Sequence, residues 1–424
     1  MPVPEVGHLV AAAELAKLLV SRDERISVRI LIQKMPYDTG FAGFTQKLKK
    51  DVPERIDFVD IPAPDETTME ELKALPLTSF HEAFVSNQRT VVRNIVTAIL
   101  KQSETSKLGG FVLDLFTTPM IEVANDFNVP AYVFFTSSAA YLNIAFYAQD
   151  LKDSKNLEIS GFKNSDIELS VPGFSNLVPA KGLPAVILDE AGSALMRTIA
   201  RRLRKTKAIF LNTVLELEAR AIKALEDDRN IPFIYHVGPL INSEIGQPTS
   251  QNKISNEAIM SWLDGQPCSS VVFLCFGSKG SFDKEQVKEI ACALELSGHH
   301  FLWSLRCPSQ TKEKRDLPKD YEDYNEVLPE GFLERTSGIG KLVKELGLAV
   351  EITLDYRKDL IGDVSPTVTA QEIEFGIRRL MNAGSEMRNK VKAMKDLCRK
   401  ANNEGGSSYS SLGQFIQEVI DNIN

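Results

Sequence analysis

Short apolar segments alternate with helical patterns through the first half of this chain of 424 residues. Helical stretches, such as residues 81–101, lie between most of these segments. Apolar strands that alternate with helices form a parallel sheet covered on both faces. The first half is therefore predicted to be α/β, with a doubly wound parallel sheet. Five segments have the length and the β-branched or aromatic content of buried strands: residues 26–32 (ISVRILI), 56–61 (IDFVDI), 110–116 (GFVLDLF), 131–135 (AYVFF) and 208–213 (AIFLNT).

The rest of the chain is predicted to form a second, smaller α/β domain. It has few strand candidates (270–278, 300–306 and 348–352) and helical stretches at 283–297, 370–383 and 413–423. Three strands are few for a doubly wound sheet, so this domain is expected to be incomplete. The predicted organisation is a first domain at 1–240, a polar linker at 241–258, a second domain at 259–407 and a C-terminal helix at 408–424.

The start of the chain shows a similar deficit. A doubly wound domain usually opens with a strand that leads into its first loop and helix. This chain opens with MPVPEVGH, which has the proline and glycine content of a loop. The first domain is therefore expected to lack its initial strand.

Charge and cysteine content exclude several classes of protein. The net charge of −8 argues against nucleic-acid binding, which needs a basic surface. The basic run at 201–207 ends a predicted helix, and a solvated helix end is favoured over a binding patch. Five cysteines without paired spacing, and no zinc-binding motif, predict neither structural disulfides nor a metal site. With no apolar run of membrane-spanning length, a cytoplasmic protein is expected.

His8 and Asp114 are the first candidates for chemistry. His8 follows Gly7 at the start of an apolar helix, and Asp114 stands at the end of a predicted strand, where open α/β sheets bind ligands. Taken alone, His8 is a helix-start residue and Asp114 a half-exposed strand end. The alternative interpretation is that the two residues form a catalytic dyad, in which the carboxylate orients the imidazole as a general base. Spacing in the sequence does not decide between these readings.

Phosphate-binding motifs are few. The stretch FLCFGSKGSF places Gly277 and Ser278 between a strand and a helix, where backbone N–H groups can bind an anion, although an ordinary tight turn has the same pattern. The stretch GIGK at 338–341 fails the P-loop pattern, because Arg335 occupies the first glycine position and Leu342 follows the lysine. No GxGxxG motif follows a strand, which gives a nicotinamide or flavin enzyme little support.

Several stretches taken together resemble the plant family 1 UDP-glycosyltransferases, and the resemblance covers nearly the whole chain. The stretches that carry it are PVPEVGHLVAAAELAKLL, LDLFTTPMIEVANDFNVPAYVFFTSSA, VPGFSNLVPAKGLP, FLNTVLELE, HVGPL, WLDGQPCSSVVFLCFGSKGSF, ELSGHHFLWSLR, LPEGFLERTSGIGK and LVKELGLAVEITLDYRKD.

This resemblance implies the GT-B fold, two Rossmann-like domains of which the first binds an acceptor and the second a UDP-sugar. His8 matches the family's general base and Asp114 its charge partner. Thr136 matches a residue that touches the sugar, and Ser278, after Gly277, matches a contact to the donor phosphate. The expected reaction transfers a sugar, expected to be glucose, from a UDP-sugar to a phenolic or terpenoid hydroxyl with inversion. No metal or other cofactor is implied, and a monomer is expected.

The family's donor-binding segment is the main departure from the resemblance. It begins Trp-Ala-Pro-Gln, continues through His-Cys-Gly-Trp-Asn-Ser and binds the uracil, ribose, diphosphate and sugar. This sequence lacks it: SGIGK runs directly into LVKELGLAVEI, which places the break at Lys341 and Leu342. The alternative function is therefore an inactive or impaired form that binds only a small acceptor or a partner.

Overall fold

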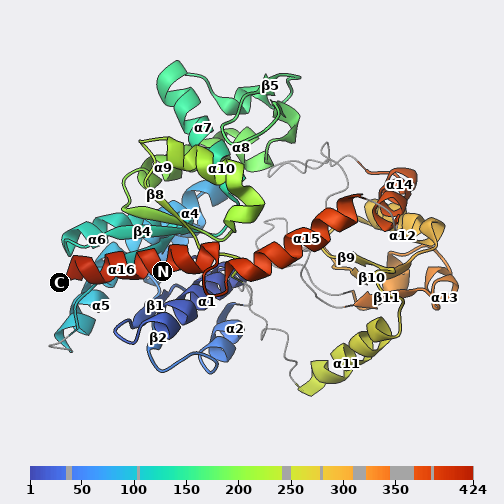
Figure 1. Cartoon of the computed structure of the whole chain (residues 1–424), viewed down its shortest axis with the longest axis horizontal. Coiled ribbons are helices and arrows are strands. Elements are labelled where there is room, and N and C mark those ends of the chain that lie inside the picture. Colours follow the sequence, from blue (N-terminus) through green and yellow to red (C-terminus); the bar gives the residue numbers. More distant parts are fainter. Residues whose placement is uncertain are drawn as a thin grey trace. The chain divides into compact units, whose positions relative to one another are not determined.

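The computed structural model forms two compact units, Met1–Asn242 with Met394–Asn424, and Ser243–Ala393 (Figure 1). The structure describes residues 1–34, 41–102, 106–240, 250–276, 280–308, 321–343, 367–382 and 386–423.

The first unit contains a four-stranded parallel sheet and a separate pair of parallel strands. The four strands lie in the order β3 (Phe111–Asp114), β4 (Ala131–Phe135), β7 (Ala208–Leu211) and β8 (Phe233–His236). The pair consists of β1 (Val28–Ile32) and β2 (Ile56–Asp60). All five strands predicted for the first half are confirmed, and β8 was not predicted.

Both faces of the four-stranded sheet are buried, which explains the continuous apolar strand sequences. Along β4, Val133 and Phe135 belong to the larger core, and Tyr132 and Phe134 belong to a second core on the opposite face. The helices of this unit are α1 (Val6–Arg22), α2 (Phe41–Leu48), α3 (Glu66–Lys73), α4 (Leu77–Asn87), α5 (Arg89–Lys101), η1 (Leu115–Met120), α6 (Ile121–Asp126), α7 (Ala139–Lys155), η2 (Ile159–Phe162), η3 (Ala180–Gly182), α8 (Ala185–Leu188), α9 (Glu190–Leu203), α10 (Leu215–Asp227) and α16 (Ser407–Ile423).

The stretch at 81–101, predicted as one helix, divides between α4 and α5 at Gln88. The Gln88 N–H donates to the carbonyl of Val85, three residues back, and this contact tightens the backbone at the junction. A short antiparallel hairpin, β5 (Glu168–Leu169) with β6 (Val178–Pro179), completes the unit.

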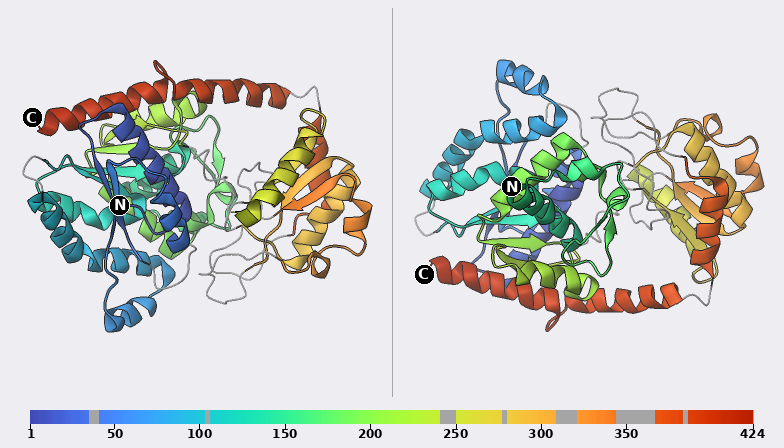
Figure 2. Two further views of the ribbon diagram at one scale, coloured as in Figure 1. Left: turned by 90° about the horizontal axis from the view of Figure 1, so that it is seen from below. Right: turned by 90° about the horizontal axis from the view of Figure 1, so that it is seen from above.

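The C-terminal helix α16 packs with α1 on the second core (Figure 2). The rings of Phe415 and Phe210 meet edge to face with centroids 4.5 Å apart. The Glu418 carboxylate accepts hydrogen bonds from the hydroxyls of Tyr235 at 2.7 Å and Tyr132 at 3.3 Å. Sheet residues far apart in the sequence thus converge on one helix face.

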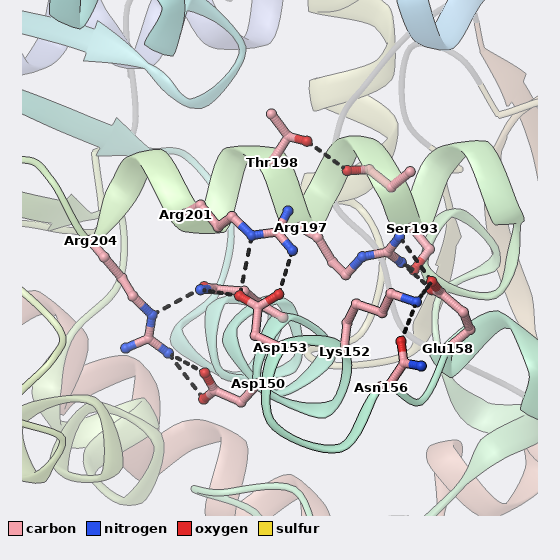
Figure 3. A network of polar contacts seen from close by, with 12 residues as sticks. Asp150, Lys152, Asp153, Asn156, Glu158, Ser193, Arg197, Thr198, Arg201 and Arg204 are labelled. Atoms are coloured by element: carbon pink, nitrogen blue, oxygen red, sulfur yellow. Dashed lines mark hydrogen bonds and ion pairs between the residues drawn. The ribbon is translucent and has the colours of Figure 1, made fainter.

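The basic run at 201–207 begins in the last turn of α9, and several of its side chains are paired with carboxylates (Figure 3). Arg201 bonds to Asp153, and Arg204 bonds to Asp150 at 2.9 Å. Both carboxylates are more than a third exposed, so each pair contributes little stability by itself. Arg201 and Arg204 thereby link the end of α9 to α7.

The second unit has a three-stranded parallel sheet in the order β11 (Gly340–Val343), β10 (His300–Ser304) and β9 (Val271–Leu274). Its helices are α11 (Ser250–Asp264), α12 (Lys284–Ser297), η4 (Tyr324–Glu326), α13 (Phe332–Arg335) and α14 (Ala370–Met381), and α15 (Glu386–Ala401) runs across the division between the units.

Residues 250–258, expected to be linker, form the first part of α11, because apolar residues such as Ile259 pack that helix against Leu302 of the sheet. The strand predicted at 348–352 lies outside the described residues, and β11 instead includes Lys341 and Leu342, where the break was placed. In the described part of the chain, no helix is long and apolar enough to span a membrane.

Candidate active site

His8 lies in the first turn of α1, where its side chain is 24% exposed. Pro2 and Pro4 precede the helix and are buried, so they fix the path of the chain into it. A β-carbon at Gly7 would meet nothing within 4 Å, so close packing does not require glycine at this position. The loop and first turn thus position the imidazole at the edge of the core.

Asp114 is the last residue of β3 and is buried, with 4% of its surface exposed. Its Oδ1 accepts the Phe116 N–H at 3.0 Å, and its backbone N–H donates to the Thr117 hydroxyl at 2.9 Å. This capping arrangement opens the 3-10 helix η1 directly after the strand. Local backbone geometry therefore fixes the carboxylate.

The structure brings His8, Asp114 and Thr136 together. His8 Nδ1 lies 2.6 Å from Asp114 Oδ2. The Thr136 hydroxyl, just after β4, is 3.2 Å from the same nitrogen. Because an ionised carboxylate only accepts hydrogen bonds, Nδ1 carries the proton and Nε2 carries the lone pair of the neutral ring. This geometry suits a general base.

The backbone of Met1 supports the same strand end. Its carbonyl accepts the Asp114 N–H at 3.1 Å and the Thr117 hydroxyl at 2.9 Å, and its amino group donates to the carbonyl of Val112 at 2.6 Å. These bonds attach the first residue of the chain to the end of β3. Burial lowers the pKa of the Met1 amino group to about 5.

Sequence reasoning missed Phe116 and Thr117. The Phe116 ring centroid lies 6.1 Å from that of His8 and 6.2 Å from that of His81. The signal for Thr117 was present, because an Asp followed three residues later by a polar side chain is a helix-start pattern. His81, for which a structural role was favoured, lies in α4.

Gly277 and Ser278, the expected phosphate contacts, lie outside the described residues. The elements on either side of them are β9 and α12, as the strand-turn-helix pattern predicts. Asp283 caps α12 by accepting the Gln286 N–H at 2.9 Å. Within the described ranges, no three His, Cys, Asp or Glu side chains are grouped so that they could hold a metal ion.

Comparison with known proteins decides the family. No protein-family model matches the chain. UDP-glycosyltransferase 71E1 of Stevia rebaudiana is 43% identical over 480 aligned residues, covering 99% of this chain and 97% of that protein. The chain belongs to the plant UDP-glycosyltransferases. UDP-glucose flavonoid 3-O-glucosyltransferase 6 of Fragaria ananassa is 41% identical, with 99% and 98% of the two chains covered.

Solved structures of plant UDP-glycosyltransferases have the same fold. A transferase from Siraitia grosvenorii in complex with UDP aligns with a TM-score of 0.83 and 36% identity, covering 99% of this chain and 98% of that one. Medicago truncatula UGT71G1, complexed with UDP-glucose, gives 0.80 and 32%, covering 99% and 97%. The predicted α/β class and GT-B fold are confirmed, and by family this UDP-glycosyltransferase is an enzyme that uses a UDP-sugar.

Proposed function

We propose that this UDP-glycosyltransferase transfers a sugar, most simply glucose, from a UDP-sugar to a hydroxyl of a small phenolic or terpenoid plant metabolite. The observation that carries the proposal is the 2.6 Å contact between His8 Nδ1 and Asp114 Oδ2 at the carboxyl end of β3. The relatives named for UDP-glucose and flavonoids support the donor and the acceptor class.

In the proposed mechanism His8 is the general base. Asp114 accepts a hydrogen bond from Nδ1–H, which keeps that proton on Nδ1. The unprotonated Nε2 therefore takes the proton of the acceptor hydroxyl, and the carboxylate stabilises the imidazolium that forms. The acceptor oxygen then attacks the anomeric carbon from the face opposite UDP. The bond from that carbon to the diphosphate oxygen breaks, UDP leaves with the electron pair, and the configuration inverts.

On the donor side we assign Thr136 to the sugar and Gly277 and Ser278 to the diphosphate. Helix N-terminal amides and such positioned side chains would stabilise the leaving diphosphate without a metal ion. The five cysteines are all free thiols, which suits the reducing cytoplasm. We propose that the reaction takes place in the cytoplasm and that the active form is a monomer.

A second candidate function is acceptor binding without turnover. The alignment with the Stevia relative spans 480 residues, more than the 424 of this chain, so that relative has residues with no counterpart here. This difference supports the interpretation that the donor-binding segment at Lys341 and Leu342 is missing. Ser278 and Thr136 could not by themselves replace a platform for the uracil and a helix for the diphosphate.

Two measurements on the full chain separate these candidates. The first is calorimetric titration with UDP-glucose, in which micromolar binding supports the enzyme and contradicts loss of the donor site. The second is incubation with UDP-glucose and a panel of phenols and terpenoid alcohols, with products identified by mass spectrometry.

If turnover occurs, His8→Ala should lower it by about 10²–10⁴-fold, the usual contribution of a general base. His299→Ala, a histidine of the second unit, is the matched control and should keep wild-type turnover. Acceptor binding without UDP-glucose binding or product would support the second function.

A further inference from the structure

The loop between β4 and α7 carries Thr136, whose hydroxyl lies 3.2 Å from His8 Nδ1. The loop is short, at residues 136–138, because β4 ends at Phe135 and α7 begins at Ala139. The position of the Thr136 hydroxyl is therefore set by whatever holds the end of the strand and the first turn of the helix.

The neighbouring strand β7 holds the end of β4. The two strands are parallel, and their pairing runs as far as Phe135 and Leu211. The N–H of the next residue, Asn212, donates to the Phe135 carbonyl at 3.4 Å. The strand side of the loop is thus fixed by the residue with which the chain leaves β7.

Glu218 of α10 holds the first turn of α7. Its carboxylate accepts the Ala139 N–H and the Ala140 N–H, each at 3.0 Å. The first N–H groups of a helix have no partner within the helix, and a negative charge beside them is favoured by the helix dipole. The backbone of α10 departs from helical geometry at Glu218, with φ −123° and ψ 31°, so the kink in α10 falls at the residue that makes these two bonds.

Two further contacts of α7 show what Glu218 adds. The Ser138 hydroxyl accepts the Tyr141 N–H at 3.1 Å, but Ser138 belongs to the loop itself and ties the helix only to that loop. Asn143 is buried in the second turn and donates to the Ala221 carbonyl of α10 at 2.9 Å, which keeps the body of α7 on α10. Glu218 extends this attachment to the turn that directly follows the loop.

We propose that Glu218 is a positioning residue of the active site, which holds Thr136 against His8 through the first turn of α7. Asn212 and Glu218 both lie in the stretch FLNTVLELE, which leads from β7 into α10. One segment therefore holds the loop at both of its ends. The catalytic meaning of this position rests on the proposed function, whereas the contact between Thr136 and His8 does not.

The test is the ¹⁵N spectrum of the His8 imidazole in the labelled full chain, with its signals assigned by their loss in His8→Ala. Thr136→Val removes the hydroxyl beside Nδ1 and should shift these signals. Glu218→Ala should shift them in the same direction and should add no further shift in the Thr136→Val background. Glu218→Gln keeps one acceptor oxygen, should cause a smaller shift, and serves if Glu218→Ala fails to fold.

Asp189→Ala is the matched control, because the Asp189 carboxylate caps α9 of the same unit by accepting the Gly192 N–H at 2.7 Å. It should leave the His8 signals unchanged. A Glu218 that only stabilises a helix would behave like this control, so unchanged His8 signals in the Glu218 variants would overturn the proposal. An equal shift with and without the Thr136 hydroxyl would also overturn it. The spectrum needs neither a UDP-sugar nor turnover, so a chain that forms no product contradicts the proposed function without bearing on Glu218.

Discussion

The imidazole of His8 meets the carboxylate of Asp114 although 106 positions separate the two residues in the chain. Replacing Asp114 with Asn should lower product formation by about 10³–10⁴-fold if the chain turns over, because an amide does not enforce the Nδ1–H tautomer. Imidazole ¹⁵N shifts test the same point without turnover: the Nδ1–H tautomer should dominate in the wild type and lose its dominance in Asp114→Asn. An unchanged tautomer population in Asp114→Asn would contradict the proposal that Asp114 fixes the tautomer of His8.

Thr117→Val should lower the free energy of unfolding by about 1–3 kcal/mol, because it removes a buried hydroxyl and leaves the Asp114 N–H with one partner fewer. The Thr117 side chain is fully buried and also donates to the Met1 carbonyl. Urea denaturation measures the change. Thr198→Val is the matched control, since the Thr198 hydroxyl donates to the Ala194 carbonyl of its own helix in a solvent-exposed hydrogen bond, and it should shift stability by less than about 0.5 kcal/mol.

Glu418→Ala should loosen α16 from the sheet. The substitution leaves the hydroxyls of Tyr132 and Tyr235 without their acceptor and is expected to cost about 1–3 kcal/mol of unfolding free energy. Burial and the nearby carboxylate raise the pKa of Tyr235 above its ordinary value, and the carboxylate's part of this rise should disappear in the variant. Chemical denaturation measures the free energy of unfolding, and ultraviolet titration follows the pKa of Tyr235. As a control, Glu404→Ala at an exposed glutamate should change neither the free energy of unfolding nor the pKa of Tyr235.

His236 should make stability fall at mildly acidic pH. Burial lowers its pKa in the folded chain, while the unfolded chain titrates near the ordinary value of 6.5. Below about pH 6.5 the unfolded state therefore binds more protons, and the free energy of unfolding decreases as pH drops. Urea denaturation at pH 7.5 and 5.5 should show a larger loss for the wild type than for His236→Gln. Equal losses would contradict a contribution from this histidine.

The strands of the first unit were predictable because both faces of the sheet are covered, which forces every position of β4 and β7 to be apolar. The four-residue β8 was missed, since it is short and ends in Tyr235 and His236. In the second unit β11 was missed for a similar reason: the polar Lys341 follows a glycine within four residues.

The sequence by itself determined the fold class, the family and the identity of His8, Asp114 and Thr136 as candidates, because periodicity and motifs are local properties of the chain. Only the tertiary structure decided that these three side chains meet, since β3 and β4 become neighbours through pairing and α1 arrives from the beginning of the chain. The hydrogen bond between Gln33 and Gln88 has the same origin. Gln33 and Gln88 are ordinary polar residues in the sequence, and folding alone buries them against each other, with polar atoms that neither can satisfy.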